Sequence, residues 1–244
     1  VEPSRWYMHC DREGILVWQD LPSPNLPEEH EAFARQNFEE EAVRIIDAFE
    51  NHPSIVQWVV FNEGWGQFDT ERMTQVVIDK VSPQSLVCCA SGWNDAEIGD
   101  IKDSHSYPYP SCPIDQKRAC VNGDITLKVP GHIWPGGDFG YTTVETPEDF
   151  TVMFNDLADK IKDHYYYGLN AAVYTQLSDV EIEKNGIYTY DRRILKPYSP
   201  TGELKDKILE CINMPQSDVK IQPVVSTAKE HKYKWKFITE DNAP

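Results

Sequence analysis

The sequence has no long apolar run, little basic charge and no motif that holds a phosphate group. Its longest strand-like apolar run is Ile55–Phe61, far below the ~20 residues that a membrane-spanning helix requires. Twenty-three Lys and Arg residues stand against 40 Asp and Glu residues, which gives a formal charge of −17. Such a chain repels phosphate backbones and anionic lipid headgroups. We therefore expect neither nucleic acid nor a membrane surface as a partner.

Cysteine is also scarce. Six cysteines in 244 residues are too few for a disulfide scaffold, and the absence of a Cys-x-x-Cys motif argues against structural zinc. Cys88 and Cys89 lie in an apolar run, which predicts buried thiols that pack as small hydrophobic groups. The first residue is Val1 and no signal peptide follows it, so either processing removed one or the chain is an interior piece of a longer protein. These observations do not decide whether the protein works in an oxidising or a reducing compartment.

What the sequence does have is core-forming and aromatic residues. Hydrophobic residues make up 40% of the chain and charged residues 26%, as in a folded domain rather than a disordered one. The length allows one large domain or two small ones. Seven Trp, 12 Tyr and 9 Phe suit a protein that stacks flat apolar faces against a ligand.

Short apolar runs alternate with longer amphipathic ones. This alternation is typical of a parallel sheet with helical crossovers. Helices are predicted over about 28–51, 69–81 and 147–166, and Asp69 or Thr70 is a fair N-cap for the second. Strands are predicted at 15–19, 55–61, 86–90, 101–104, 119–122 and 171–176.

Six such strands fit either a doubly wound sheet or part of an eight-stranded barrel. No glycine-rich phosphate loop follows any strand, which argues against the nucleotide-binding version of the doubly wound sheet. Polar residues instead follow many strand ends, which is how a (β/α)₈ TIM barrel builds an active site. We therefore predict an α/β fold with an incomplete TIM barrel that lacks its first strands. The polar residues at the strand ends include Asp20, Asn62, Glu63, Asn94, His105, Asp124 and Gln176.

The pattern changes after Pro197. Residues 204–212 are predicted to form a closing helix, 213–223 a linker, and 224–244 the start of a β-rich segment. The predicted division is a partial barrel over 1–212 and a linker with a β-rich segment over 213–244.

The most informative motif runs from Asn51 to Trp65 and places Glu63 just beyond a buried strand, between an amide and a Gly-Trp pair. Desolvation in an apolar, aromatic-walled mouth would favour the neutral carboxyl, as a general acid requires. The alternatives are a glutamate that caps the next helix or one that pairs with an arginine.

This stretch resembles glycoside hydrolase family 2, the family of β-galactosidases, β-glucuronidases and β-mannosidases. In that family the acid/base is the Glu of an Asn-Glu pair after the fourth barrel strand, which corresponds to Asn62-Glu63. Further segments resemble the family in the same order, and together they cover about residues 1–200: Val1–Asp11 with Gly14–Asp20, Asp103–Pro108, and Ala171–Gln176 with Asp179–Gly186.

The resemblance places the nucleophile after the seventh strand, where the family has a glutamate and this chain has Asp124. Aspartate is one methylene shorter, and a retreat of about 1 Å costs about a hundredfold when geometry is off. Three interpretations stay open: Asp124 is the working nucleophile, the barrel is diverged and inactive, or the two sequences are misaligned here.

The remaining candidate site residues are assigned by chemistry. Four aromatic residues could stack on sugar faces: Trp65, Trp93, Tyr107 and Trp134. Five polar residues could bind hydroxyl groups: Asp20, Asn62, Asn94, His105 and Gln176. Each of these residue types is more often structural when it stands alone. No cofactor or metal is predicted, although the acidic loop at Asp179, Glu181 and Glu183 could hold a structural Ca²⁺ or Mg²⁺ ion.

The expected function is removal of a terminal β-linked sugar, β-galactosidase-like, by retaining double displacement. The alternative is a catalytically impaired barrel that acts as a carbohydrate-binding or structural module. The expected partners are a carbohydrate and the missing barrel strands, supplied by an N-terminal part of the same protein or by another chain. The resemblance favours a secreted or periplasmic-type compartment.

Overall fold

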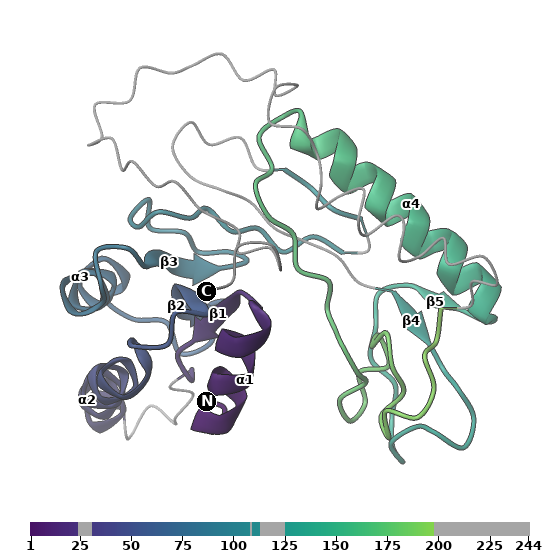
Figure 1. The fold of residues 1–244 in the computed structure, drawn as a ribbon, viewed down its shortest axis with the longest axis horizontal. Helices are drawn as coiled ribbons and strands as arrows, with labels where there is room; N and C mark the ends of the chain where they lie inside the picture. Colours follow the sequence, from purple (N-terminus) through teal and green to yellow (C-terminus); the bar gives the residue numbers. More distant parts are fainter. Residues whose placement is uncertain (24–30, 108, 113–124, 198–244) are drawn as a thin grey trace, which may run out of the picture.

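A computed structural model describes residues 1–23, 31–107, 109–112 and 125–197 of the chain (Figure 1). The strand predicted at 119–122, the helix predicted at 204–212 and the whole segment 213–244 lie outside these ranges. Asp124 also lies outside them.

The N-terminal half alternates helices and strands. Its order is α1 (Ser4–Glu13), β1 (Val17–Asp20), α2 (Glu31–Phe49), β2 (Ile55–Asn62), α3 (Thr70–Lys80) and β3 (Leu86–Ser91). The three strands form one parallel sheet in the order β1-β2-β3. Parallel neighbours need crossover connections, and α2 and α3 supply them. Because the strands run the same way, their carboxyl ends at Asp20, Asn62 and Ser91 meet at one edge.

The core of this half explains why β2 is the central strand. Trp58, Val60 and Phe61 are buried on β2, and Ile46 and Phe38 bury the inner stripe of α2 against the sheet. The Phe38 and Phe61 rings stack with their centroids 5.3 Å apart. A strand that is apolar on both faces is stable only when other elements cover both faces of the sheet. The end of β2, and the residues that follow it, are therefore held in place by this packing.

The C-terminal half consists of two short parallel strands, β4 (Thr126–Leu127) and β5 (Thr143–Val144), and the long helix α4 (Pro147–Tyr165). Thr146 caps α4, because its side chain accepts a hydrogen bond from the backbone N–H of Asp149, and Pro147 takes the first helical turn. Phe150, Phe154 and Leu157 pack against β4 in a second, smaller core.

Most predicted elements are confirmed, and two predictions need correction. The helix α1 was not predicted, although Pro3 before it and the left-handed Gly14 after it are ordinary boundary signals. The predicted strand at 171–176 is wrong, because these residues form no strand ladder; the Gln176 carbonyl accepts instead from the N–H of Ile187 in a loop. Residues 101–104 contribute only one parallel bridge, Cys88 to Ile101.

Smaller predictions have mixed outcomes. Asp69 does stand at the N-cap of α3, but its side chain makes no capping hydrogen bond. Cys88 and Cys89 are fully buried free thiols, as predicted. Within the described ranges the strands form two separate sheets and no closed barrel. None of the described helices has an apolar stretch long enough to cross a bilayer.

Candidate active site

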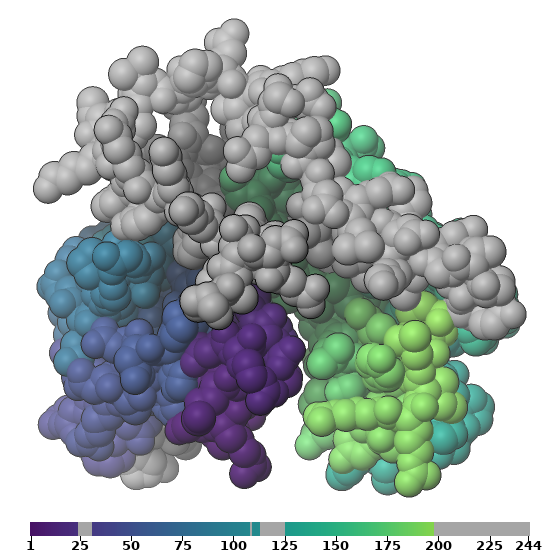
Figure 2. Space-filling model, in the orientation of Figure 1, coloured from purple at the N-terminus to yellow at the C-terminus, as the bar shows by residue number. Residues whose placement is uncertain are grey.

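A pocket of about 800 Å³ lies where the two halves face each other. The groove between them is visible in Figure 2, between the first residues of the chain and the segment that follows α4. One wall comes from α1 and from the carboxyl ends of β1, β2 and β3, and the other comes from loops of the C-terminal half, with Tyr141, Thr175, Glu183 and Asn185. The shared edge of the parallel sheet therefore forms part of the pocket.

Glu63 enters this pocket from the turn that ends β2. Its φ of 51° is left-handed, a conformation that non-glycine residues seldom adopt. Two hydrogen bonds hold it there: the Glu63 N–H donates to the Ser91 carbonyl at 2.8 Å, and the Trp93 indole N–H donates to the Glu63 carbonyl at 3.0 Å. The turn thus aims the carboxyl group away from the sheet and into the pocket, where the side chain is 24% exposed.

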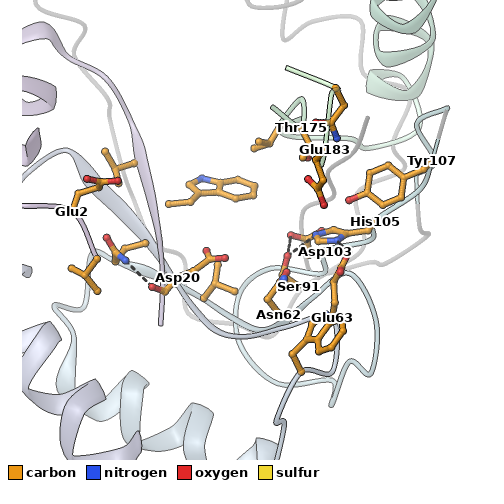
Figure 3. A pocket seen from close by; sticks show the side chains of 18 of the residues that line it. Glu2, Asp20, Asn62, Glu63, Ser91, Asp103, His105, Tyr107, Thr175 and Glu183 are labelled. Atoms are coloured by element: carbon orange, nitrogen blue, oxygen red, sulfur yellow. Dashed lines mark hydrogen bonds and ion pairs between the residues drawn. The ribbon is translucent and has the colours of Figure 1, made fainter. Parts of the chain in front are cut away.

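The Glu63 carboxyl group begins a chain of hydrogen-bonded side chains (Figure 3). Its Oε1 lies 2.6 Å from His105 Nδ1. His105 Nε2 lies 2.8 Å from Ser91 Oγ, and Ser91 Oγ donates to Asp103 Oδ2 at 3.0 Å. The chain therefore runs from the open pocket to a buried aspartate.

Negative charge is concentrated next to this chain. Burial and the neighbouring charge of Asp103 raise the pKa of Asp20 to about 6. Water reaches the Asp20 side chain, but protein surrounds it on most sides within the pocket, so desolvation still acts. Burial also raises the pKa of Asp103, against the opposing influence of His105 and Ser91.

An aromatic surface lies beside the carboxyl groups of the pocket. The Tyr107 and Tyr141 rings stack at 4.5 Å with an angle of 10° between their planes, and Tyr107 packs edge-on against His105. Trp65 is 56% exposed at the pocket mouth. Flat apolar rings around a set of carboxyl groups suit a ligand with both C–H faces and hydroxyl groups.

Gln176 organises the opposite wall. Its amide N–H₂ donates to Glu183 at 3.0 Å and to Asn185 at 2.8 Å, and both acceptors line the pocket. Gln176 itself does not line the pocket, so in this structure it positions other residues.

The pocket brings together six of the predicted site residues: Asp20, Asn62, Glu63, Trp65, His105 and Tyr107. Besides Gln176, three others lie outside its lining. Trp93 supports the Glu63 turn, the Asn94 carbonyl accepts from Gln67, and Trp134 packs on Tyr190 with ring centroids 4.9 Å apart. Direct sugar contact by these three, by Gln176 and by Asp124 stays a prediction.

Sequence reasoning had not assigned Asp103, Tyr141 and Glu183 to the site, although all three line the pocket. Asp103 had a readable signal. It stands two residues before His105, and in an extended segment residues two apart share a face. Glu183 and Asn185 show the same spacing. For Tyr141 the sequence carries no such signal, because its stacking on Tyr107 joins distant loops.

No cluster of three His, Cys, Asp or Glu side chains suited to a metal ion occurs in the described residues. In the acidic loop of Asp179, Glu181 and Glu183, the Asp179 carboxylate bonds to Lys196 Nζ at 2.5 Å and to the Gly186 N–H at 2.9 Å.

Residues 2–126 match the family described as "Glycosyl hydrolases family 2, TIM barrel domain". Among curated proteins, a mannosylglycoprotein endo-beta-mannosidase of Lilium longiflorum is 25% identical over 86% of this chain and 24% of its own length. Beta-mannosidase B of Aspergillus flavus is 25% identical over 43% of this chain and 16% of its own length. The chain thus spans a quarter or less of these relatives.

Solved structures share the fold at low identity. A GH2 beta-galacturonidase from Eisenbergiella tayi bound to galacturonate matches with a TM-score of 0.60 and 16% identity, over 84% of this chain and 42% of that one. A beta-glucuronidase from Ruminococcus gnavus matches with a TM-score of 0.55 and 14% identity, over 83% of this chain and 40% of that one.

Proposed function

Because the chain belongs to glycosyl hydrolases family 2, we propose that it hydrolyses a terminal β-linked glycoside with retention, and that Glu63 is its acid/base. One observation carries this proposal: the Glu63 carboxyl group projects into an aromatic-lined pocket and bonds to His105 at 2.6 Å. A carboxyl group held in this way can give a proton to a glycosidic oxygen and later take one from water.

The proposed reaction has two displacements. Asp124 attacks the anomeric carbon while Glu63 protonates the departing oxygen, which leaves a glycosyl ester on Asp124. Glu63, now a carboxylate, then removes a proton from water, and the oxygen of that water displaces Asp124 with the original configuration restored. Asp124 takes this role from its place in the family pattern, after the strand predicted at 119–122.

For the sugar itself, we propose a neutral hexose rather than a uronic acid. Five carboxyl side chains line the pocket: Glu2, Asp20, Glu63, Asp103 and Glu183. No lysine or arginine stands among the described lining residues. A uronate would add a further negative charge where several already converge, and like charges in such a setting are destabilising. Galactose was the first expectation, and the names of the curated relatives add mannose.

The substrate prediction is checked with a panel of 4-nitrophenyl β-glycosides. We expect kcat/KM for the β-mannoside or the β-galactoside to exceed that for the β-glucuronide by at least about tenfold. A preference for the glucuronide or galacturonide would contradict the charge argument without affecting the role of Glu63.

The role of Glu63 is tested by Glu63→Gln, which keeps the size of the side chain but cannot donate a proton. We expect kcat on a methyl or disaccharide glycoside to fall by about 10²- to 10⁴-fold. With a 2,4-dinitrophenyl glycoside, whose aglycone departs unprotonated, the glycosylation step should be nearly unchanged. Added azide should restore turnover of that substrate, because azide needs no general base.

Wild-type turnover of the unactivated glycoside by Glu63→Gln would remove Glu63 as the acid. A 2-deoxy-2-fluoro glycoside that labels Asp124, detected by mass spectrometry of the peptide, would identify the nucleophile. Labelling of another carboxyl group would show that the family alignment is shifted at Asp124. A protein that binds the sugar without turning it over would favour the non-catalytic barrel.

A further inference from the structure

The hydrogen bonds around His105 specify which of its ring nitrogens carries the proton. Ser91 has a single hydroxyl proton, and that proton is donated to Asp103 Oδ2. The Ser91 oxygen must then act as the acceptor toward His105 Nε2, 2.8 Å away. Nε2 is therefore the protonated nitrogen, and in the neutral ring Nδ1 is left as an acceptor.

An acceptor at Nδ1 has a consequence for Glu63. Nδ1 lies 2.6 Å from Glu63 Oε1, and two acceptors at this distance need a proton between them. The arrangement is satisfied when Glu63 is protonated and donates to Nδ1, or when the ring is an imidazolium. In both forms a proton lies between the acid/base and the histidine.

Asp103, at the buried end of this series of hydrogen bonds, determines the direction in which the Ser91 hydroxyl donates. The Asp103 side chain is 2% exposed; its Oδ1 makes no hydrogen bond but lies 3.9 Å from His105 Nε2, where its charge also favours a proton on that nitrogen. An ionised aspartate can only accept, so it forces the Ser91 hydroxyl to point toward it. Gly92 makes the assembly possible, because a Cβ there would lie 2.9 Å from the His105 ring and 3.3 Å from Glu63 Cγ.

We propose that Asp103 is a positioning residue which, through Ser91, keeps His105 Nε2 protonated and thereby keeps a proton between Glu63 Oε1 and His105 Nδ1. This inference rests on the proposed role of Glu63 as the acid/base. It adds a control of that role by a buried residue that does not touch the reacting atoms. Exchange of a carboxylate for an amide behind a catalytic histidine is known to select the wrong tautomer.

Asp103→Asn is the direct test. The amide can donate to Ser91 Oγ, so the hydroxyl can turn and donate to His105 Nε2. The ring then carries its proton on Nδ1 and donates to Glu63, which stabilises the carboxylate. The loss of the Asp103 charge acts in the same direction. We expect the basic limb of the pH profile of kcat/KM to move down by about one pH unit.

Other charged and titratable groups face the hydrogen-bonded side chains of Glu63, His105, Ser91 and Asp103, and this test leaves them unchanged. They are Asp20 on β1, Cys88 on β3, Tyr107 beside the ring, and Glu183 on the opposite wall. Asp100→Asn is the matched control. Asp100 accepts from the Val87 N–H at 2.9 Å, outside the pocket, so its pH profile should match that of the wild type.

A measurement independent of catalysis separates this proposal from the proposed function. Selective ¹⁵N labelling of histidine, with the His105 signal assigned by its absence in His105→Gln, reports the tautomer directly. We expect the Nε2–H form or the imidazolium in the wild type, and a shift toward Nδ1–H in Asp103→Asn and Ser91→Ala. Ser91→Ala keeps the Asp103 charge 3.9 Å from Nε2, so it removes the hydrogen-bond relay alone and its shift should be smaller than that of Asp103→Asn.

An Nδ1–H ring in the wild type, or the same tautomer in all three proteins, would overturn the proposal even if Glu63 is the acid. A tautomer shift without any glycosidase activity would support the proposal's chemistry and contradict the proposed function. A basic limb that stays in place in Asp103→Asn would overturn the proposed control of Glu63.

Discussion

At the scale of single residues, the pocket surrounds Asp20 with an environment that disfavours the charged form of its carboxyl group. Its pKa is raised to about 6, because protein surrounds it and the Asp103 carboxylate is close. The folded state therefore binds this proton more tightly than the unfolded chain. Between the unfolded pKa, near 4, and about 6, stability contributed by the neutral form is lost as the pH rises.

Asp20→Asn replaces the titrating carboxyl group by a neutral amide, so the variant does not lose this stability as the pH rises. We expect the melting temperature of the variant to exceed that of the wild type by a few degrees at pH 7.5 and to approach it at about pH 3, where Asp20 is largely protonated in both states. Calorimetry across this range checks the sign. A variant less stable than the wild type at pH 7.5 would show that the Asp20 carboxylate makes a favourable contact.

At the scale of elements, one wall of the pocket is a loop that is held by a buried ion pair between Lys196 and Asp179. Lys196 Nζ bonds to Asp179 Oδ1 at 2.5 Å and to the Lys184 carbonyl at 2.9 Å, and the Lys196 and Asp179 side chains are 0% and 1% exposed. Burial lowers the pKa of Lys196 and raises that of Asp179, while each partner opposes the shift of the other. The pair fixes the loop that carries Glu183 and Asn185.

Lys196→Met leaves the Asp179 carboxylate buried without its cation. We expect a loss of roughly 3–5 kcal/mol in the free energy of unfolding, measured by urea denaturation. The double variant Asp179→Leu, Lys196→Met removes both charges and should recover much of this loss. Equal losses in the single and double variants would show that the apolar parts of the side chains, rather than the pairing, stabilise the loop.

At the scale of the whole molecule, the described sheet has an open edge. β1 pairs only with β2 among the described strands, and Ile15 and Leu16, just before it, are 47% and 67% exposed. An unpaired strand edge with apolar neighbours promotes association with other chains. We propose, as the sequence led us to expect, that strands outside residues 1–244 pair with β1, from the same polypeptide or from another chain.

The 244-residue chain alone should then self-associate. Light scattering after size-exclusion chromatography is expected to show oligomers, and Leu16→Lys, which places a charge beside β1, is expected to reduce them. A monomeric chain that unfolds cooperatively would contradict the open-edge proposal.

The sequence alone determined the features that depend on local pattern. The buried strand β2, the helix α4, and the position of Glu63 just beyond a strand follow from hydrophobic period, which acts within a few residues. The same local logic could have found α1, between Pro3 and Gly14. It gave a strand at 171–176 because an apolar run favours extended backbone, but a strand also needs a neighbour to complete its ladder, and that is not a local property.

Only the tertiary structure decided which of the strand-end residues meet. Asp20, Asn62 and Ser91 converge because three parallel strands end at one edge, and this much the sequence could suggest. The contact of Glu63 with His105, 42 positions away, and the stacking of Tyr107 on Tyr141 depend on how loops cross that edge. Such contacts join segments with no shared period, so no pattern within the sequence encodes them, and the direction of the hydrogen bonds from Asp103 to Glu63 exists only once the chain has folded.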